Sequence, residues 1–280
     1  ARFDEDNNIQ WAKQLEQAGV HVVYGIIGFK THTKIALIIR KEKGHLRNYF
    51  HIGTGNYNSN TSKFYTDLGL LSTDPDIAAD LIELFNYLSG FSKQKNFQKL
   101  LVSPSSMRDK FVFLIKREIQ NAEQGKKAEI IAKMNSLVDP EIIQLLYLAS
   151  QAGVKISLII RGICCLYPQR KNLSENIQVI SIVGHFLEHS RIFWFCNDND
   201  HEVFIGSADW MRRNLDRRIE AVTPIEDLEL KSRLFTLLQT YMKDNYFSWV
   251  MKKDGSYEKY QNKLPTNKSQ LDLIKKREKY

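Results

Sequence analysis

The chain has 280 residues, of which 43% are hydrophobic, so it is long enough for about two globular domains and too apolar for extensive disorder. Its formal net charge of +8 favours polyanionic partners such as phosphates, nucleic acid or an anionic membrane face. Three cysteines without a CxxC spacing argue against a disulfide framework or a zinc motif and favour a reducing, cytoplasmic compartment. No apolar run approaches the roughly eighteen residues that span a bilayer, and no signal peptide is evident.

Residues 1–100 are predicted to form a first lobe of helices and strands. The chain begins at Ala1 without an initiator methionine, directly before a good helix, and we expect it to be part of a longer protein. The predicted elements are a helix from Asn7 or Asn8 to Gly19, a strand at 20–27, a hairpin of strands at 34–39 and 48–52, and a helix from Pro75 to Gly90. The continuous apolar run at 20–27 is typical of a strand that is covered on both faces.

Residues 101–280 are predicted to form the second lobe. Its predicted elements are a helix at 105–124, a strand at 129–134, a helix from Pro140 to Gly153, a strand at 154–160, a hairpin of strands at 191–195 and 203–205, a helix at 226–242 and an amphipathic basic helix at 270–280. Strands alternate with helices in both halves, and each half also carries a hairpin. This pattern predicts an α/β fold of two related lobes, each a mixed sheet flanked by helices.

The most informative feature is a set of residues that occurs once in each half. The first copy consists of His32-Thr33-Lys34, Gly53-Thr54-Gly55-Asn56 and Asp67. The second copy consists of His189-Ser190-Arg191, Gly206-Ser207-Ala208-Asp209 and Glu220. From the glycine onward, corresponding residues are always 153 positions apart. One His-x-Lys alone is most often a polar strand face, but repetition of the whole set predicts a single active site assembled from two related lobes.

The residue types of this motif suit phosphate chemistry. Residues two apart on a strand point to the same face, so we expect His32 to lie beside Lys34 and His189 beside Arg191. The small-residue turns let backbone N–H groups and short polar side chains approach an anion. The acidic residue after each turn can accept a hydrogen bond from one imidazole nitrogen and raise the basicity of the other. We therefore expect a cationic pocket in which one histidine attacks phosphorus and the other protonates a leaving oxygen.

These motifs resemble the phospholipase-D-like superfamily, in which two HxK motifs related by pseudo-symmetry form a phosphohistidine site. More specifically, the chain resembles the C-terminal catalytic half of the bacterial polyphosphate kinase family. The closer resemblance rests on segments spread over almost the full length: Ala1-Arg2-Phe3-Asp4-Glu5, Gly28 to Lys34, His51 to Asn58, Tyr65-Thr66-Asp67, Arg161-Gly162, Phe186 to His189, and Ser207 to Asn214. It implies two phospholipase-D-like lobes.

The resemblance also implies an activity and roles for particular residues. It implies reversible transfer of the terminal phosphate of ATP to polyphosphate through a phosphohistidine at His32. It implies that His189 acts at the leaving or attacking oxygen, and that Tyr65, Arg161 and His189 contact ATP. Arg2 matches a position assigned to a Mg²⁺ site. Because a guanidinium cannot ligate a cation, Arg2 would act through metal-bound phosphate oxygens.

Further polar groups are expected to bind the substrate. Lys34, Arg161 and Arg191 can neutralise phosphate oxygens, and Asn56 lies in the first turn. One or more of the arginines at 212, 213, 217 and 218 can add charge, although they can equally form a solvated helix face. The expected partners are ATP or ADP and inorganic polyphosphate, not nucleic acid. We also expect a homo-oligomer of the full-length protein, and peripheral contact with the inner membrane face stays open.

Two other functions stay open. A phosphodiesterase of the same superfamily, a phospholipase or a nuclease, would use both histidines and water. Against it, the second copy has Arg191 and Asp209 where those enzymes favour lysine and asparagine. A catalytically silent polyanion-binding module is the third alternative, and the intact pair of histidines with matched carboxylates speaks against it.

Overall fold

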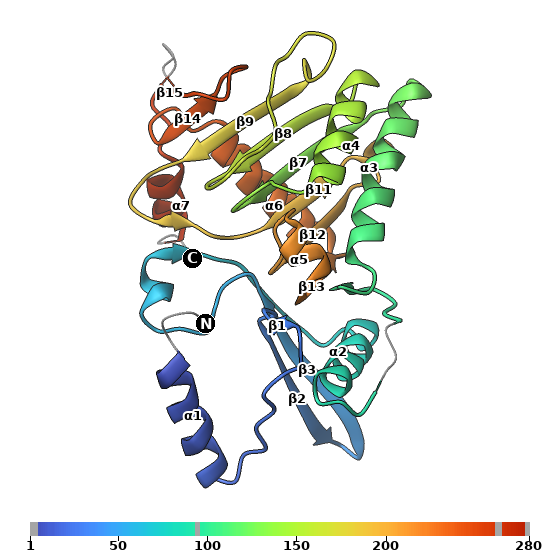
Figure 1. The fold of residues 1–280 in the computed structure, drawn as a ribbon, viewed down its shortest axis with the longest axis vertical. Coiled ribbons are helices and arrows are strands. Elements are labelled where there is room, and N and C mark those ends of the chain that lie inside the picture. Colours follow the sequence, from blue (N-terminus) through green and yellow to red (C-terminus); the bar gives the residue numbers. More distant parts are fainter. Residues whose placement is uncertain (1–4, 93–95, 261–264, 278–280) are drawn as a thin grey trace.

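A ten-stranded mixed sheet dominates the structure, a computed structural model that describes residues 5–92, 96–260 and 265–277 (Figure 1). The strands lie in the order β1 (Lys30–Thr31), β13 (Arg218–Ile225), β12 (Glu202–Gly206), β11 (Ile192–Phe195), β7 (Glu129–Met134), β8 (Lys155–Ile160), β9 (Ile177–Ile182), β14 (Ser248–Met251) and β15 (Tyr257–Lys259), and β6 (Leu101–Ser103) also pairs with β13. Strands β7, β8 and β9 are parallel, whereas β11, β12 and β13 are antiparallel neighbours. The predicted mixed sheet is therefore confirmed for the second lobe.

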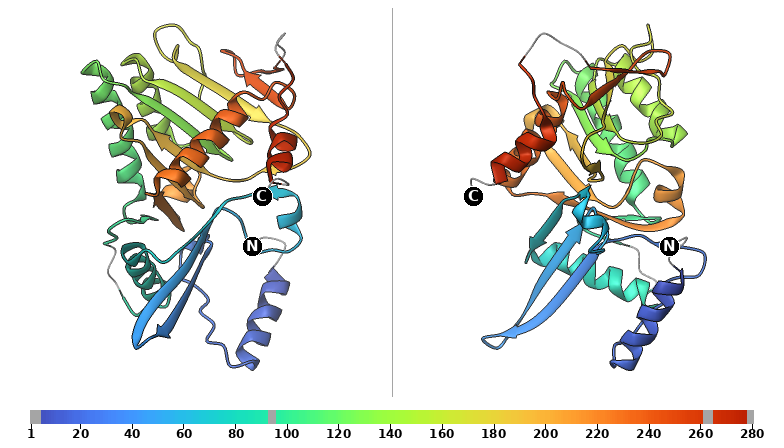
Figure 2. Two further views of the ribbon diagram at one scale, coloured as in Figure 1. Left: turned by 180° about the vertical axis from the view of Figure 1, so that it is seen from behind. Right: turned by 90° about the vertical axis from the view of Figure 1, so that its left-hand side faces the viewer.

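Helices cover both faces of this sheet (Figures 1 and 2). Helices α3 (Met107–Glu123) and α4 (Pro140–Gln151) pack on one face, where Phe111 contacts a core that includes Phe193. Helix α6 (Leu228–Met242) packs on the other face, where Leu238 belongs to a second core with Trp194. Alternate residues of the central strands β7 and β11 enter different cores, so these strands are covered on both faces.

The smaller part of the molecule is built on an antiparallel sheet of β2 (Ile35–Glu42), β3 (His45–Gly53) and β5 (Gly69–Ser72). Helix α2 (Pro75–Leu88) covers it, and Asp74 caps this helix by accepting hydrogen bonds from the amides of Asp76 and Ile77. The first lobe was expected to hold a mixed sheet of its own. That expectation is wrong, because β2, β3 and β5 form an antiparallel meander. The parallel strands of the first half, β1 and β4 (Tyr65–Thr66), pair with strands of the second half.

The two halves of the chain exchange short strands. From the first half, β1 pairs in parallel with β13, so that Thr31 lies opposite Ile219. From the second half, β10 (Leu187–Glu188) pairs in parallel with β4 (Tyr65–Thr66), so that Glu188 lies opposite Thr66. Each histidine motif therefore begins immediately after a strand that is hydrogen-bonded to the opposite half.

The predicted strand at 20–27 is wrong. Helix α1 (Glu5–Gln17) buries none of its residues, and the segment after it has no regular structure. Tyr24 is 74% exposed and Ile27 is fully exposed. Gly25 and Gly28 adopt φ angles of +87° and +86°, which break an extended strand. An apolar run alone therefore did not distinguish a covered strand from an irregular segment.

The predicted helices and strands of the second half are confirmed, but several strands were missed. The most important is β13, which contacts three other strands although it contains Arg218, Glu220 and Pro224, residue types that disfavour a central strand. The remaining short elements are α5 (Arg212–Asp216) and the 3-10 helices at Thr61–Lys63 and Asn197–Asn199. The predicted basic helix is present as α7 (Ser269–Arg277), and its last predicted residues, 278–280, lie outside the described residues. Across the described ranges, no helix has the length and apolarity needed to cross a membrane.

Candidate active site

Both histidine motifs lie in three-residue links between strands. His32-Thr33-Lys34 joins β1 to β2, and His189-Ser190-Arg191 joins β10 to β11. The expectation that they lie on strands is therefore wrong. The main chain explains their positions, because the His32 amide donates to the carbonyl of Ile219 at 2.8 Å and the His189 amide donates to that of Thr66 at 3.2 Å. Each motif is held by the half of the chain to which it does not belong.

The histidine–carboxylate pairs are crossed between the two halves. His32 Nδ1 lies 2.8 Å from Glu220 Oε2, and His189 Nδ1 lies 2.8 Å from Asp67 Oδ1. The sequence singled out these four residues but did not reveal that each imidazole takes its carboxylate from the other copy. Neither half therefore holds a complete pair by itself.

The hydroxyl in each small-residue turn positions the carboxylate of its own copy. Thr54 Oγ1 donates to Asp67 Oδ1 at 2.7 Å, and Ser207, its counterpart in the second copy, donates to Glu220 Oε2. Glu220 also accepts a hydrogen bond from the side-chain amide of Asn214. No role for Asn214 was evident from the sequence, although this residue ends the motif segment Ser207 to Asn214. The turns thus orient the carboxylates, in addition to any contact with an anion.

Close approach explains two of the glycines. A Cβ atom at Gly55 would lie 2.1 Å from Asp67 Oδ2, inside the carboxylate that holds His189. A Cβ atom at Gly206 would lie 2.4 Å from the carbonyl oxygen of Ala221 on the neighbouring strand. Neither position has room for a side chain. The counterpart of Gly55 in the second copy is Ala208, so the two turns differ in how tightly they approach their carboxylates.

The cations of the two motifs, Lys34 and Arg191, are both buried next to the histidine–carboxylate pairs. Lys34 is 5% exposed, its ammonium donates to the carbonyl of His32, and burial lowers its pKa to about 8. Arg191 is 3% exposed and donates to the carbonyl of Thr54 at 3.2 Å, so it bridges from the second half to the first. Its Nε also donates to Asp209 Oδ1 at 3.1 Å. Asp209, where phosphodiesterases favour asparagine, is thus the counterion of Arg191.

Both imidazoles are tuned toward the neutral form. Burial lowers the pKa of His32, and the hydrogen bond to Glu220 opposes this shift without reversing it. Burial likewise lowers the pKa of His189 against the opposing effect of Asp67. A neutral ring that donates from Nδ1 to a carboxylate keeps the Nε2 lone pair free, which is the form required of a nucleophile. At His189, Nε2 lies 3.2 Å from Nη1 of Arg191.

Three further predicted residues, Tyr65, Arg161 and Asn56, belong to the described part of the chain. The Tyr65 ring centroid is 5.1 Å from that of His189. Arg161 is exposed and donates from Nε to Asn135 Oδ1 at 2.8 Å, and Asn135 in turn donates to the carbonyl of His189 at 3.3 Å. Asn56 is exposed at the end of the first turn. Arg2 lies outside the described residues.

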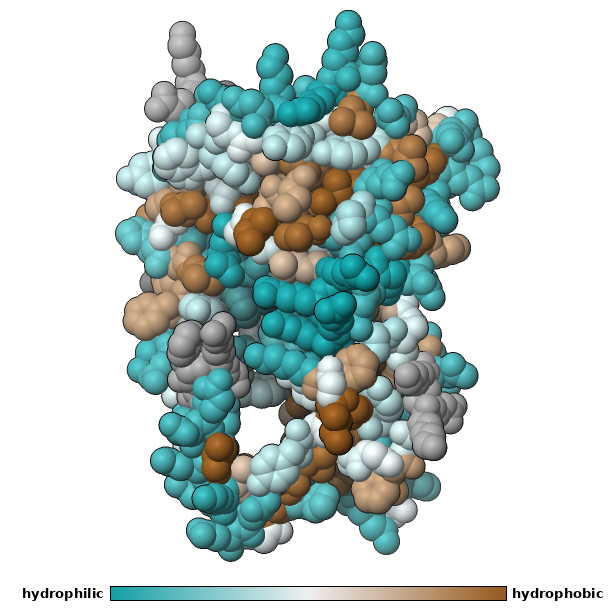
Figure 3. Space-filling view, in the orientation of Figure 1, coloured by the Kyte–Doolittle hydropathy of each residue, from teal (hydrophilic) through white to brown (hydrophobic). Residues whose placement is uncertain are grey.

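The arginines at 212–218 separate into two kinds. Arg212 has a side chain that is 74% exposed, and Arg213 and Arg217 are also exposed. They lie at α5 in the middle of the molecule, where Figure 3 shows the most strongly hydrophilic surface. Arg218 differs because it is half-buried on β13, and its charge lowers the pKa values of both His32 and Lys34. The structure thus singles out Arg218 as the arginine of this cluster that acts on the histidine site.

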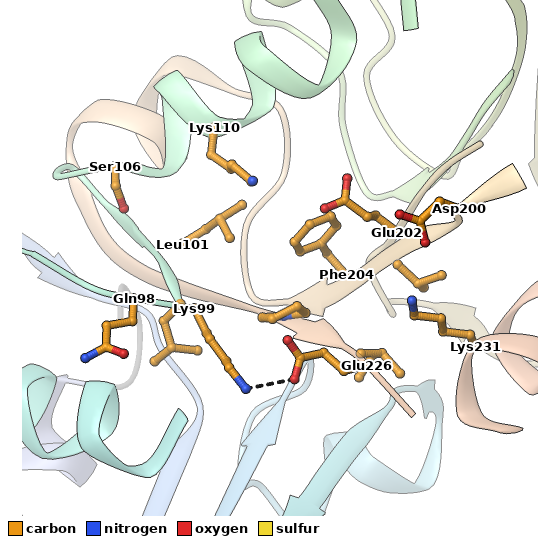
Figure 4. A pocket seen from close by; sticks show the side chains of 14 residues that line it. Gln98, Lys99, Leu101, Ser106, Lys110, Asp200, Glu202, Phe204, Glu226 and Lys231 are labelled. Carbon is orange, nitrogen blue, oxygen red and sulfur yellow. Dashed lines mark hydrogen bonds and ion pairs between the residues drawn. The ribbon is translucent and has the colours of Figure 1, made fainter. Parts of the chain in front are cut away.

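A separate pocket of about 410 Å³ lies away from the two histidines (Figure 4). Two of its three lysines are already engaged within the protein: Lys99 Nζ lies 2.8 Å from Glu226 Oε2, and Lys231 donates to the carbonyl of His201 at 2.8 Å. Acidic residues such as Glu202 line the same pocket. This hollow is therefore poorly suited to a polyanion, and the histidine site is the better candidate.

The chain matches two family models along almost its whole length. Residues 1–94 match polyphosphate kinase C-terminal domain 1, and residues 100–270 match polyphosphate kinase C-terminal domain 2. The fold and the site define a two-lobed α/β protein whose histidine–carboxylate pairs are shared between the lobes. The chain belongs to the polyphosphate kinase family.

Individual relatives and structures agree with this assignment. The chain is 62% identical over 277 residues to a polyphosphate kinase of Parasynechococcus marenigrum, which covers 98% of this chain and 39% of that relative. The crystal structure of the Porphyromonas gingivalis polyphosphate kinase superposes with a TM-score of 0.91 at 36% identity, over 98% of this chain and 43% of that one. The Haemophilus influenzae phosphatidylserine synthase shares the fold at a TM-score of 0.52 and 11% identity, over 82% of this chain and 67% of that one. The chain thus spans about two fifths of the length of its polyphosphate kinase relatives.

Proposed function

We propose that this chain is the catalytic part of a polyphosphate kinase, which transfers the terminal phosphate of ATP reversibly to polyphosphate through a phosphohistidine at His32. The observation that carries the proposal is the crossed arrangement of two histidine–carboxylate pairs beside the buried cations Lys34 and Arg191. Two oriented imidazoles in a cationic environment suit phosphoryl transfer, where catalysis is mostly positioning and charge neutralisation. Similar proteins named polyphosphate kinase support the same activity.

In the proposed first step, the Nε2 lone pair of His32 attacks the γ-phosphorus of ATP. A nitrogen–phosphorus bond forms, the bond from that phosphorus to the β–γ bridging oxygen breaks, and ADP departs with the electron pair. Glu220 accepts the Nδ1–H of the ring at 2.8 Å and stabilises the positive charge that phosphorylation places on the imidazole. The buried position of Glu220, whose side chain is 0% exposed, keeps this interaction away from competing water.

In the proposed second step, a terminal oxygen of polyphosphate attacks the same phosphorus and His32 leaves as the neutral ring. The reverse sequence transfers phosphate from polyphosphate to ADP. His189, with Tyr65 and Arg161 next to it, is positioned to contact the nucleotide and the leaving or attacking oxygen. Lys34 and Arg218 supply positive charge on the side of His32. Together these groups would neutralise the equatorial oxygens of the transferred phosphate.

Magnesium enters this proposal only with the nucleotide. Within the described part of the chain, no group of three or more His, Cys, Asp or Glu side chains could hold a metal ion. These residues therefore do not fit a resident Mg²⁺ site, and no step is assigned to one. Mg²⁺ commonly accompanies nucleotide phosphates with few protein ligands, so the assay substrate is MgATP. The role of Arg2 at metal-bound phosphate oxygens stays a prediction.

Labelling tests the proposal directly. The full-length protein, incubated with MgATP labelled at the γ-phosphate, is expected to form an acid-labile adduct that maps to His32. Label on another residue, or no label, contradicts the proposal. The phosphodiesterase alternative is tested in parallel with bis(p-nitrophenyl) phosphate, whose cleavage without any nucleotide would favour that activity over the kinase.

A further inference from the structure

His189 lies between two residues that share a buried partner. Lys133 Nζ on β7 is 3.0 Å from Glu188 Oε2 and donates to Ser190 Oγ at 2.7 Å. Lys133, Glu188 and Ser190 are each at most 3% exposed. A buried ammonium that binds the residues before and after His189 fixes the main chain on both sides of the ring. Such buried, fully paired groups hold one arrangement strongly, because breaking one contact leaves a charge without a partner.

Gln270 on α7 extends this network across 82 positions of sequence. Its Nε2 donates to Glu188 Oε1 at 2.7 Å. The same amide pairs with the backbone of Phe186, donating to its carbonyl at 2.9 Å and accepting from its N–H at 3.0 Å. Gln270 is only 2% exposed. One side chain thus holds both the strand that leads into His189 and the carboxylate next to it.

Helix α7 is docked through its first turn, where Ser269 and Gln270 are buried. Ser269, which is 0% exposed, donates from its amide to Asp244 Oδ2 at 2.7 Å. Leu273 packs against the core beneath α6, whereas Lys275 is exposed. Gly184 makes room for the glutamine, since a Cβ atom there would lie 2.4 Å from Gln270 Oε1. The basic C-terminal helix, which the sequence presents as a surface tail, therefore delivers one uncharged side chain to the His189 segment.

We propose that Gln270 is a positioning residue for His189, acting through Glu188 and the buried Lys133. The network fixes the strand Leu187–Glu188, and this strand sets the depth of the imidazole beside Asp67, Arg191 and Arg161, the charged groups that face it. The expected effect on kcat rests on the proposed function, whereas the expected effect on the position of His189 does not. The position of His189 can be measured without turnover.

Four variants of the full-length protein separate positioning from simple helix docking. Gln270→Met keeps the volume but removes the amide. Gly184→Ala keeps glutamine at position 270, but the new methyl group displaces the glutamine side chain. Leu273→Ala weakens the docking of α7 without touching the network, and Lys275→Gln is the surface control.

The first readout is the pKa and exchange rate of His189, from hydrogen–deuterium exchange at its imidazole C2 position followed by mass spectrometry. The second is kcat and KM for MgATP.

We expect Gln270→Met and Gly184→Ala each to raise the His189 pKa toward the ordinary value of about 6.5, because a loosened ring is less buried. We expect kcat to fall roughly 10-fold with a smaller change in KM, by analogy with residues that orient metal-bound histidines. The double variant should be no worse than Gln270→Met alone, since both changes remove the same contact. The His189 pKa should stay unchanged in Leu273→Ala and Lys275→Gln.

Two results would overturn the positioning role. One is a His189 pKa and kcat in Gln270→Met equal to those of Lys275→Gln. The other is a Leu273→Ala variant that reproduces both effects at the same loss of melting temperature, which would reduce Gln270 to a docking residue. Absence of any His32 labelling in the unaltered protein would instead count against the proposed function. The exchange measurement would still decide whether Gln270 positions His189.

Discussion

The two histidine sites are built from the same motif but differ in how deeply their carboxylates are buried. Glu220, the partner of His32, is 0% exposed and is held by Ser207 and Asn214. Asp67, the partner of His189, is 25% exposed, and its side chain accepts a hydrogen bond from Thr54. The first pair joins an imidazole whose side chain is 20% exposed to a fully buried carboxylate. The second pair joins a less exposed imidazole, at 12%, to a carboxylate that water can reach.

The cations beside the two histidines also differ in chemical type. Lys34, beside His32, is a buried ammonium whose pKa falls to about 8, so its charge can be lost near physiological pH. Arg191, beside His189, is a planar guanidinium whose Nε donates to Asp209 Oδ1 at 3.1 Å. The two copies thus share a motif but differ in environment, which is consistent with the different roles proposed for His32 and His189. The following predictions test that division.

The largest expected effect is the difference in activity between the His32→Ala and His189→Ala proteins. His32→Ala should lower phosphoryl transfer by roughly 10⁴-fold or more, because it removes the proposed nucleophile. His189→Ala should be less damaging and should leave some labelling of His32 by γ-labelled ATP. Steady-state rates and mapped label together check this prediction. The opposite result would be label on His189 in the His32→Ala protein and no label in the His189→Ala protein. It would show that His189, not His32, is the nucleophile.

The loss of activity on replacing each carboxylate should be larger for the more deeply buried one. Glu220→Gln should slow transfer by about 100-fold and Asp67→Asn by about 10-fold, the two ends of the range for residues that orient functional histidines. Glu220 should matter more because water cannot replace it at a side chain that is fully buried. Single-turnover rates of His32 phosphorylation provide the measurement. Equal effects would show that burial does not distinguish the two pairs.

The turns offer a matched pair of small substitutions. Gly55→Ala should displace the Asp67 carboxylate, whose Oδ2 would lie 2.1 Å from the new Cβ, and should lower activity up to about as much as Asp67→Asn. The corresponding change in the other copy, Ala208→Gly, should cost about 1 kcal/mol of stability and leave activity nearly unchanged. Thermal unfolding and kcat for both variants make the comparison. Full activity in Gly55→Ala would remove the turn from the site.

The smallest expected effect is a shift in pH dependence. Lys34 is charged below its pKa of about 8 and loses its charge as the pH rises through that value, so kcat/KM for MgATP should fall on the alkaline side. Lys34→Arg keeps the charge and should extend the plateau to higher pH. Arg191→Lys should do the opposite and introduce a new alkaline fall. Profiles of kcat/KM between about pH 6 and 10 test this, and identical profiles for all three proteins would contradict it.

The sequence was sufficient for the longer helices of the second lobe, for its strands β7, β8, β11 and β12, and for all four members of the histidine–carboxylate pairs. It was not sufficient for their pairing, because motif spacing records duplication but not which copy faces which. Strand β13 was missed since Arg218, Glu220 and Pro224 hide its strand character, and the crossing depends on that strand. The contribution of Gln270 was also invisible, because a single polar residue in a basic tail carries no periodic signal.

The crossing of the two pairs is tested most directly by measuring the pKa of each histidine, through exchange at imidazole C2, in Glu220→Gln and Asp67→Asn proteins. Glu220 raises the pKa of His32 and Asp67 raises that of His189. We therefore predict that Glu220→Gln lowers the His32 pKa and leaves His189 nearly unchanged, and that Asp67→Asn does the reverse. A His32 pKa that follows Asp67, or a His189 pKa that follows Glu220, would show that each half pairs with itself and would contradict the shared site.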